Sequence, residues 1–368
     1  MDENRLRPWL ALNRAPGVGT LTFTRLLAHF DEPEAVFAAP RDELAALGLG
    51  SETLDYLAAP DEAGVAADLA WLASAPEHHL LTCREAAYPR RLAAIADPPP
   101  LLFLRGDPSL LEKDPMLAVV GSRTPSAAGE ELARQMAAEL ASAGCTIVSG
   151  LAAGIDGAAH AGALSVGGGT LAVLGTGPDR VYPARHRELA RGIAESGLLV
   201  SEFPPGTRPR PHHFPRRNRV ISGLCQGVLV VEAAARSGSL ITAEFALEQG
   251  REVFAVPGSP RNPRARGTNG LLREGAILAE SAADVLHGLG CVAPPECDES
   301  HTLVPAVPAD LPAAARELLA QLDAEPVTPD LLVARCGLTA EAVSSMLLLL
   351  ELQGLVKTAP GAGVYRAM

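Results

Sequence analysis

The chain has 368 residues, which is long enough for two or three domains, and 48% of them are hydrophobic, which is ample for a sizeable core. Its six cysteines are scattered without a C-x-x-C pair, so the sequence predicts reduced thiols in a cytoplasmic protein and argues against a zinc site. The first ten residues, MDENRLRPWL, are too polar for a signal peptide, and no apolar run approaches the roughly 20 residues of a membrane span.

Acidic and basic side chains are distributed unevenly along the chain. The net charge of −12 is concentrated in residues 1–75, which carry −7, and in residues 310–368, which carry −3. No acidic residue lies between Glu202 and Glu232, a window with five arginines, and a second arginine-rich window lies between Glu252 and Glu274. A local basic surface on an acidic protein can still bind a polyanion, with strong salt dependence.

Residues 1–75 are predicted to form an all-helical domain. Glycine-rich turns at Gly17–Gly19 and Gly48–Gly50 separate helical runs, and the pair resembles tandem helix-hairpin-helix units, whose turns can hold a DNA phosphate. The alternative is a small helical bundle used for packing or protein contacts, and the negative charge of this region favours that interpretation.

Residues 76–290 are predicted to form an α/β domain with a parallel sheet. Two short strands, at 80–82 and 101–104, flank a proline-rich stretch and are expected at a sheet edge. Apolar runs then alternate with helical segments, which is typical of a parallel sheet buried on both faces. The six predicted strands of this repeating part are 117–120, 146–148, 171–174, 198–200, 228–231 and 253–256.

The loops that follow these six strands are expected on one edge of the sheet, because the crossovers between parallel strands are right-handed. The first loop, Gly121-Ser122-Arg123, offers backbone N–H groups, a hydroxyl and a guanidinium near a helix N-terminus, where a phosphate would fit. A tight turn with a solvated arginine is the alternative. Both arginine-rich windows belong to loops at the same edge.

Residues 291–310 contain four prolines and are predicted to be a linker, and residues 311–368 follow the helix–helix–helix–two-strand order of a winged helix. Thr339 is expected to cap the third helix, which should end at Gly354. That helix carries Glu341 and Glu351 and no basic residue, whereas a helix that reads DNA should carry arginine or lysine. A protein-contact role is therefore favoured for this module.

Several chemistries lack their motifs. The chain has no G-x-x-x-x-G-K-[ST] loop and no G-x-G-x-x-G fingerprint, so ATP hydrolysis and dinucleotide chemistry are unsupported and no cofactor or metal is expected. Asp156 and His160 share a helical face, but a helix cap and a satisfied histidine are favoured over a catalytic pair. Ser237-Gly238-Ser239 lacks the G-x-S-x-G elbow and suits capping or phosphate binding better than nucleophilic attack.

Six motifs in order resemble the DprA (DNA-processing protein A, or Smf) family: AVVGSR at 118–123, IVSGLAAGIDGAAH at 147–160, VYP at 181–183, HFPRRNRVISGL at 213–224, EAAARSGSLIT at 232–242 and AVPG at 255–258. This resemblance covers residues 80–288 and implies an extended Rossmann-like fold that binds single-stranded DNA, forms homodimers and loads RecA recombinase during natural transformation. It implies no catalytic residue.

The resemblance places the DNA pocket at Arg123 and at the Arg217-Asn218-Arg219 run, and the dimer interface near Leu272 and Leu278. Many family members carry a lysine after the YP motif, where this chain has Ala184 and then Arg185. Bases could stack on Tyr182, Phe203 or Phe214, of which Phe214, in an expected loop, is the best candidate. The expected DNA contacts are Gly121, Ser122, Arg123, Ser149, Gly150, Gly154, Arg185, Phe214, Arg216, Arg217, Asn218, Arg219, Ser237, Gly238 and Ser239.

Two alternatives remain open. One is a Rossmann-like enzyme of the nucleoside-monophosphate phosphoribohydrolase type, which uses a P-G-G-x-G-T loop and a catalytic glutamate; Pro257-Gly258-Ser259-Pro260 resembles only the start of that loop. The other is an adaptor that has lost DNA binding. Release of free base from nucleotides would favour the first, and gel shifts would decide the second.

Overall fold

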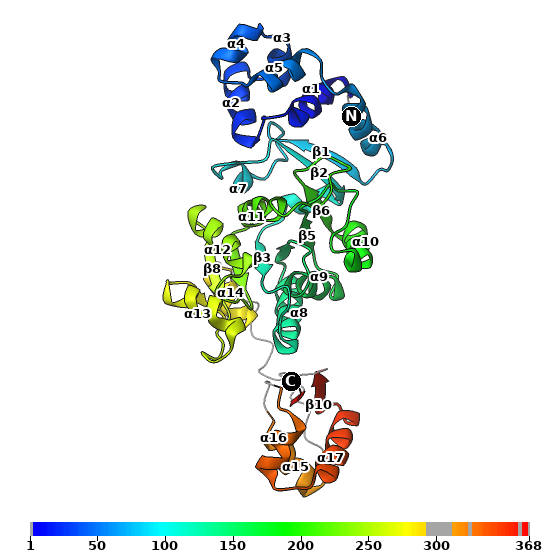
Figure 1. Ribbon diagram of the computed structural model, residues 1–368, viewed down its shortest axis with the longest axis vertical. Helices are drawn as coiled ribbons and strands as arrows, with labels where there is room; N and C mark the ends of the chain where they lie inside the picture. The colour runs from blue at the N-terminus through cyan, green and yellow to red at the C-terminus, as the bar shows by residue number, and fades with distance from the viewer. Residues whose placement is uncertain (1–2, 292–310, 323–325, 360–362, 367–368) are drawn as a thin grey trace. The chain divides into compact units, whose positions relative to one another are not determined.

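The computed structural model describes residues 3–291, 311–322, 326–359 and 363–366, and the chain divides into two compact units, residues 1–292 and 293–368 (Figure 1). The linker predicted at 291–310 lies, apart from Cys291, outside the described residues.

The first unit combines an N-terminal helical region with one large sheet. Its helices are α1 (Glu3–Arg14), α2 (Thr20–Phe30), α3 (Pro33–Ala38), α4 (Arg41–Ala46), α5 (Ser51–Ala58), α6 (Glu62–Ala73), α7 (Arg90–Ala93), α8 (Ala127–Ser142), α9 (Ile155–Ser165), α10 (Arg187–Ser196), α11 (His213–Leu224), α12 (Gly238–Glu248), α13 (Arg266–Arg273) and α14 (Ala282–Gly288), with the 3-10 helices η1 (Pro108–Glu112), η2 (Ala184–His186) and η3 (Pro263–Ala265). Its strands are β1 (His78–Thr82), β2 (Leu101–Gly106), β3 (Met116–Val120), β4 (Thr146–Ser149), β5 (Thr170–Val173), β6 (Leu198–Ser201), β7 (Gly227–Val230), β8 (Glu252–Ala255) and β9 (Ile277–Leu278).

The nine strands form one sheet in the order β1-β2-β6-β5-β4-β3-β7-β8-β9. In this spatial order, all neighbouring strands from β6 through β5, β4, β3, β7 and β8 to β9 pair in parallel. The six predicted strands β3 to β8 therefore end at one edge of the sheet. The α/β class with a Rossmann-like parallel sheet is therefore confirmed. The strand order reverses at β3, which lies between β4 and β7, and ligands of such sheets bind outside the carboxyl ends of the strands at this point.

Only one of the two strands expected at the sheet edge is found there. The antiparallel strand β1 is the edge strand, but β2 lies inside the sheet, between β1 and β6. The physical reason is that the prolines at 98–100 precede β2 and do not lie within it. All N–H groups of β2 are therefore available for pairing with both neighbours.

Alternating side chains of the sheet pack into cores on its two faces. On β3, Ala118 and Val120 pack with helices α11 and α12, whereas Leu117 and Val119 pack with α8, α9 and α14. This is the period-2 pattern of a strand buried on both sides. The face of α8 that carries Met136 and Leu140 is buried, as its helical spacing predicts.

The N-terminal helices share their core with the sheet. Trp9, Phe23 and Leu26 pack in one cluster with Leu101 and Phe103 of β2. The helical character of residues 1–75 is thus confirmed. This region packs against the antiparallel end of the sheet, where β1 and β2 lie (Figure 1).

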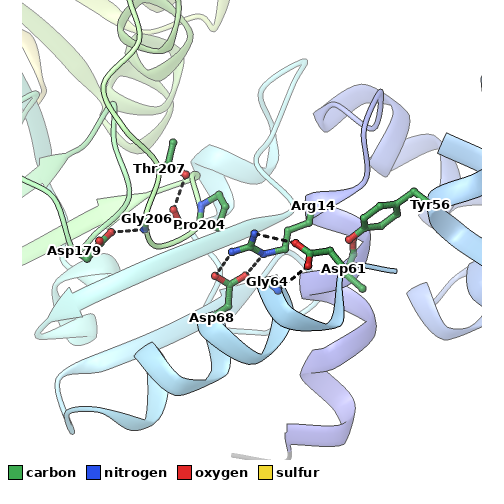
Figure 2. A network of polar contacts seen from close by, with 10 residues as sticks. Arg14, Tyr56, Asp61, Gly64, Asp68, Asp179, Pro204, Gly206 and Thr207 are labelled. Atoms are coloured by element: carbon green, nitrogen blue, oxygen red, sulfur yellow. Dashed lines mark hydrogen bonds and ion pairs between the residues drawn. The ribbon is translucent and has the colours of Figure 1, made fainter. Parts of the chain in front are cut away.

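A buried ion pair joins α1 to α6 (Figure 2). Arg14 donates from Nε and Nη2 to the two carboxylate oxygens of Asp68, both at 2.7 Å, and lies 3.8 Å from Asp61. Burial raises the pKa of the Asp68 carboxyl, while the hydrogen bonds from Arg14 oppose that shift. The like charge of Asp179, which accepts a hydrogen bond from the Gly206 N–H at 2.8 Å, also raises this pKa.

Replacing Arg14 by methionine is expected to destabilise the protein, because it leaves the Asp68 carboxylate buried without its partner. Breaking a fully buried pair costs about 3–5 kcal/mol, and since 19% of the Arg14 side chain is exposed we expect a loss of about 2 kcal/mol in the free energy of unfolding. Urea unfolding followed by circular dichroism measures this loss. Arg7→Met is the matched control, because the Arg7–Glu62 pair is exposed and should contribute less than about 1 kcal/mol. Equal losses in the two variants would contradict the assignment.

The second unit has the predicted winged-helix outline. Its elements are α15 (Ala313–Ala320), α16 (Pro329–Cys336), α17 (Ala340–Leu352), β10 (Val356–Ala359) and β11 (Gly363–Arg366). Thr339 caps α17 by accepting a hydrogen bond from the Ala342 N–H at 3.3 Å, as predicted. Within the described residues no single helix is long and apolar enough to cross a membrane; α16 and α17 pass that test only as a pair, with a bend of 112° between them.

Candidate nucleic-acid interface

The loops after β3, β4 and β7 meet at the point where the strand order reverses. The Ser122 N–H donates to the Glu232 carbonyl at 2.7 Å, and the Ser122 carbonyl accepts from the Ile155 N–H at 3.2 Å. Gly121 is required by this crowding, since a Cβ there would lie 2.7 Å from the Ile155 side chain and 2.9 Å from the Glu232 carbonyl. Gly154 has a φ of +78°, and a Cβ on it would collide with the Ser122 carbonyl. Gly121 and Gly154 therefore allow close packing of the loops.

The Glu232 carboxylate fixes the loop that carries Arg123. It accepts from the Ser126 N–H at 2.8 Å and from the Ser126 hydroxyl at 2.5 Å. The Ser122 hydroxyl accepts from the Thr124 N–H at 3.1 Å, which closes the turn around Arg123. Arg123 itself is exposed, so the backbone is held while its guanidinium stays available to a ligand. Glu232 was missed from sequence, because its partner is 106 residues away.

An aromatic surface continues from Arg123. The Arg123 Cζ lies 5.7 Å from the centroid of the Phe214 ring, and the centroids of Phe214 and Tyr182 are 5.4 Å apart at an interplanar angle of 40°. Tyr182 is 50% exposed and Phe214 is half-buried against Gly175, where a Cβ would lie 2.8 Å from the Phe214 ring. We call Arg123, Phe214 and Tyr182 the aromatic platform. Its order of guanidinium, ring and ring suits phosphates and stacked bases.

Two features of this region differ from the sequence predictions. Phe214 lies in the first turn of α11 and not in a loop, because Pro215 is tolerated so near a helix N-terminus. Phe203 is buried: its ring stacks on His213, with centroids 4.2 Å apart, and lies beneath the Arg216 guanidinium at 5.5 Å. Phe203 is a core residue and offers no stacking face.

Arg217 and Arg219 do not present their guanidinium groups at this surface, and the prediction that they line the pocket needs correction. Arg217 is 3% exposed and donates to the Gly150 carbonyl at 2.6 Å and to the Val173 carbonyl. Burial lowers its pKa to about 10, so it stays charged at neutral pH. Arg219 is 5% exposed and ion-pairs with Glu202 at 2.6 Å and with Asp97 at 3.1 Å. Both residues therefore stabilise the carboxyl edge of the sheet from its buried side.

Arg216 and Asn218, from the same motif, reach the surface. The Arg216 side chain is 42% exposed and lies 3.0 Å from the buried Glu202 carboxylate, which orients it. Burial raises the pKa of Glu202, while Arg219 and Arg216 lower it. Asn218 is partly exposed and donates to the Gly238 carbonyl at 3.3 Å. These two residues extend the basic edge toward α12.

The small residues of the neighbouring loops support the edge and offer few side-chain contacts. The buried Ser149 hydroxyl donates to the Val119 carbonyl at 2.6 Å, and a Cβ on Gly150 would collide with the Arg217 guanidinium. Ser237 caps α12 by accepting from the Ser239 N–H at 3.4 Å, and Ser239 is buried. Of these predicted contacts only Gly238 is exposed, whereas Ser149, Gly150 and Ser239 are buried and do not present their atoms at the surface.

Arg185 lies in η2 and lines a pocket of about 500 Å³ together with Arg123 and Gly154. Two further residues of this pocket, Glu130 and Arg134 of α8, were missed from sequence. Their spacing of four residues places them on one helical face, but only the packing of α8 on α9 reveals that this face meets Arg185. Arg185 therefore occupies a basic site even though the family lysine is absent.

Asp156 and His160 lie buried in helix α9. The Asp156 carboxylate accepts from the N–H groups of Gly150 (3.1 Å) and Ala152 (3.3 Å). His160 is fully buried, its Nδ1 lies 2.7 Å from the Thr170 hydroxyl, and burial lowers its pKa to about 3. Each of the two side chains thus has its own hydrogen-bond partners in the fold. In the described part of the chain no group of three His, Cys, Asp or Glu side chains could hold a metal ion.

The two residues predicted at the dimer interface lie in different environments. Leu272 is in α13 and packs partly against the core, whereas Leu278 is in β9 and is 47% exposed. Strand β9 pairs only with β8 among the described strands, so Leu278 lies at the open edge of the sheet.

Comparisons with known proteins agree with this architecture. Residues 79–290 match the family model of DNA recombination-mediator protein A, and residues 304–362 match the DprA winged helix domain. The chain is 45% identical to "Protein Smf" of Escherichia coli over 82% of this chain and 80% of that protein. It is 47% identical to "DNA processing protein DprA" of Bacillus subtilis over 55% of this chain and 68% of that one.

Two solved structures are also similar. DNA processing protein A of Streptococcus pneumoniae superposes with a TM-score of 0.68 and 37% identity, covering 76% of this chain and 97% of that one. DNA processing protein A of Helicobacter pylori, described for its single-stranded DNA binding mode, superposes with a TM-score of 0.52 and 29% identity. The match covers 57% of this chain and 95% of that one. The motifs, the sheet with its winged-helix unit and these matches together show that the chain belongs to the DNA recombination-mediator protein A (DprA/Smf) family.

Proposed function

We propose that this protein binds single-stranded DNA along the edge formed by the carboxyl ends of β3 to β8. The observation that carries the proposal is the aromatic platform, in which the exposed Arg123 guanidinium lies beside the rings of Phe214 and Tyr182. Single strands are bound by a basic groove that follows the phosphates and by aromatic rings on which bases stack. The solved Helicobacter pylori relative, described by its single-stranded DNA binding mode, supports this assignment.

The direct contacts of the proposal come from the exposed members of the predicted set. Arg123, Arg185 and Arg216 would bind phosphates, and Phe214 with Tyr182 would stack on bases. Backbone groups of Ser122 and Gly238 lie at the same edge, and Asn218 donates a hydrogen bond to the Gly238 carbonyl. The buried residues Ser149, Gly150, Arg217 and Arg219 would act by holding this edge in shape.

In the cell, we propose that the protein protects incoming single strands and loads RecA recombinase onto them during natural transformation and recombination. The relatives named as DNA-processing proteins and the family description as a recombination mediator support this role. We further propose a cytoplasmic homodimer that works by binding, without catalysis, ATP or a metal. The predicted division into residues 1–75, 76–290, 291–310 and 311–368 is retained as part of this proposal.

The winged-helix unit is proposed to contact protein and not DNA. Helix α17 carries Glu341 and Glu351 and no basic residue, while Leu348 and Leu352 are 59% and 79% exposed on it. A helix with acidic and apolar exposed residues is poorly suited to a phosphate backbone. This unit is therefore a place where a protein partner could bind.

A titration of oligo-dT against the corresponding duplex tests the proposed function. Without ATP or a divalent metal, the single strand is expected to bind at least about tenfold more tightly, since stacking needs unpaired bases. Binding should fall steeply between 50 and 200 mM salt, as for a protein that contacts several phosphates. Equal affinity for the duplex, or a requirement for ATP, would contradict the proposal.

A further inference from the structure

Beside the aromatic platform, the pocket that contains Arg185 is unusually rich in positive charge. It has a volume of about 500 Å³ and is lined by Arg123 of the loop after β3, by Arg134 in the middle of α8, and by Arg185 of η2. Arg123 belongs to both the platform and the pocket, so a strand that crosses the platform can end in the pocket. Glu130 is the acidic residue of the lining.

The first turn of helix α9 also faces this pocket. The helix has 11 residues, Gly157 and Ala158 line the cavity, and the N-cap residue Gly154 has no side chain to cap the first turn, of which the Ile155 N–H is donated to the Ser122 carbonyl. The carboxylate of Asp156 is turned away, to the N–H groups of Gly150 and Ala152. The positive end of the helix therefore adds to the field of the three arginines.

The charge of the pocket exceeds that of one phosphodiester. Three guanidinium groups against one carboxylate leave a surplus of two positive charges. Arg134 pairs with Glu131 only at 3.6 Å, and the two side chains are 43% and 59% exposed, so the pair is weak. In the described residues Arg123 and Arg185 have no ion-pair partner. An internal phosphodiester carries a charge of −1, whereas a phosphomonoester carries about −1.5 to −2 at pH 7.

We propose that this pocket binds a phosphomonoester, the group found at a phosphorylated end of a DNA strand or on a free mononucleotide. The inference rests on the proposed function, because the strand that delivers its end to the pocket lies on the aromatic platform. Arg123, Arg134 and Arg185 surround the phosphate, and the positive end of α9 faces it. Charge-assisted contacts of this kind favour the dianion over the monoanion.

The test compares full-length protein binding to dT15 with two hydroxyl ends, with a 5′-phosphate and with a 3′-phosphate, each labelled internally. At pH 7.5 at least one phosphorylated strand is expected to bind about tenfold more tightly than the unphosphorylated strand. Competition with dTMP, with thymidine and inorganic phosphate as comparisons, distinguishes a free nucleotide from a strand end as the ligand. If dTMP displaces the phosphorylated strand, the pocket binds the free nucleotide. If the phosphorylated strand is preferred and dTMP does not bind, the pocket binds the strand end.

Variants of the pocket are compared by the ratio of the affinity for the phosphorylated strand to the affinity for the unphosphorylated strand. This ratio is insensitive to a general loss of DNA binding. Arg134→Gln and Arg185→Gln should reduce the ratio to about one, and Glu130→Gln should raise it. Arg187→Gln is the matched control, because Arg187 is exposed two residues beyond Arg185 and does not line the pocket. Equal binding of all three strands would overturn this inference and leave the proposed function intact, whereas no binding of any strand would overturn both.

Discussion

A Leu278→Glu variant is expected to sediment as a folded monomer and to lose most of the affinity advantage that a long single strand has over a short one. Leu278 is 47% exposed on β9, at the open edge of the sheet, and the family resemblance places the dimer interface there. A two-fold axis beside this edge would join two copies through the same surface, which is the commonest oligomer symmetry. A charge in such an apolar interface would separate the subunits.

The loss on long strands follows from effective concentration. Two DNA-binding edges in one dimer can bind one long strand together, and such linkage raises affinity by about 10²- to 10⁴-fold over a single site. The variant should bind short oligonucleotides as the wild type does. Leu247→Glu is the matched control, because Leu247 is 57% exposed and belongs to helix α12, not to strand β9. A wild-type protein that sediments as a monomer, or a dimeric Leu278→Glu variant, would show that the interface lies elsewhere.

Replacing Arg123 by alanine is expected to weaken single-stranded DNA binding by at least about tenfold with little loss of stability. A hydrogen bond to a charged group contributes about 1.5–3 kcal/mol, which corresponds to that change in affinity. The Arg123 side chain is exposed and its described contact is the Phe214 ring at 5.7 Å, which is worth about 0.5–1 kcal/mol at an exposed site. Fluorescence anisotropy measures the affinity, and thermal unfolding measures the stability.

Phe214→Leu separates the stacking contribution from the charge. Leucine keeps an apolar side chain over Gly175 but removes the ring, and one stacked base is worth about 1–3 kcal/mol. Arg191→Ala is the charge control, since Arg191 pairs with Glu188 on α10 and does not belong to the platform. If Arg123→Ala, Phe214→Leu and Arg191→Ala bind the single strand equally well, the platform is not the DNA site.

The sheet could be predicted from sequence because each strand signal is local. Buried parallel strands are short apolar runs, and their loops must lie on one edge once the crossovers are right-handed. The sequence signals of the winged-helix elements are also local, and Thr339 caps α17 as its position predicts. The place of β2 inside the sheet was missed, because pairing with β6 depends on residues about 100 positions away.

The site was predicted less completely, for two physical reasons. The motif HFPRRNRV was interpreted as a basic loop, although in a helix Arg217 lies four residues after the buried His213 and four before the buried Ile221. Helical periodicity would have placed its guanidinium inside. The second reason is long range: Arg134 joins Arg123 and Arg185 only because α8 packs on α9, and no spacing in the sequence expresses that contact.

Photo-crosslinking of single-stranded DNA that carries 5-iodo-deoxyuridine, followed by peptide mass spectrometry, tests the central claim most directly. This base crosslinks to aromatic side chains on which it stacks, so the location of the adducts shows where the strand lies. The platform predicts adducts at Phe214 and Tyr182, of which Tyr182 is 50% exposed. Adducts confined to the N-terminal helices or to α17, with none in residues 175–224, would contradict the assignment of the DNA surface to the carboxyl edge of the sheet.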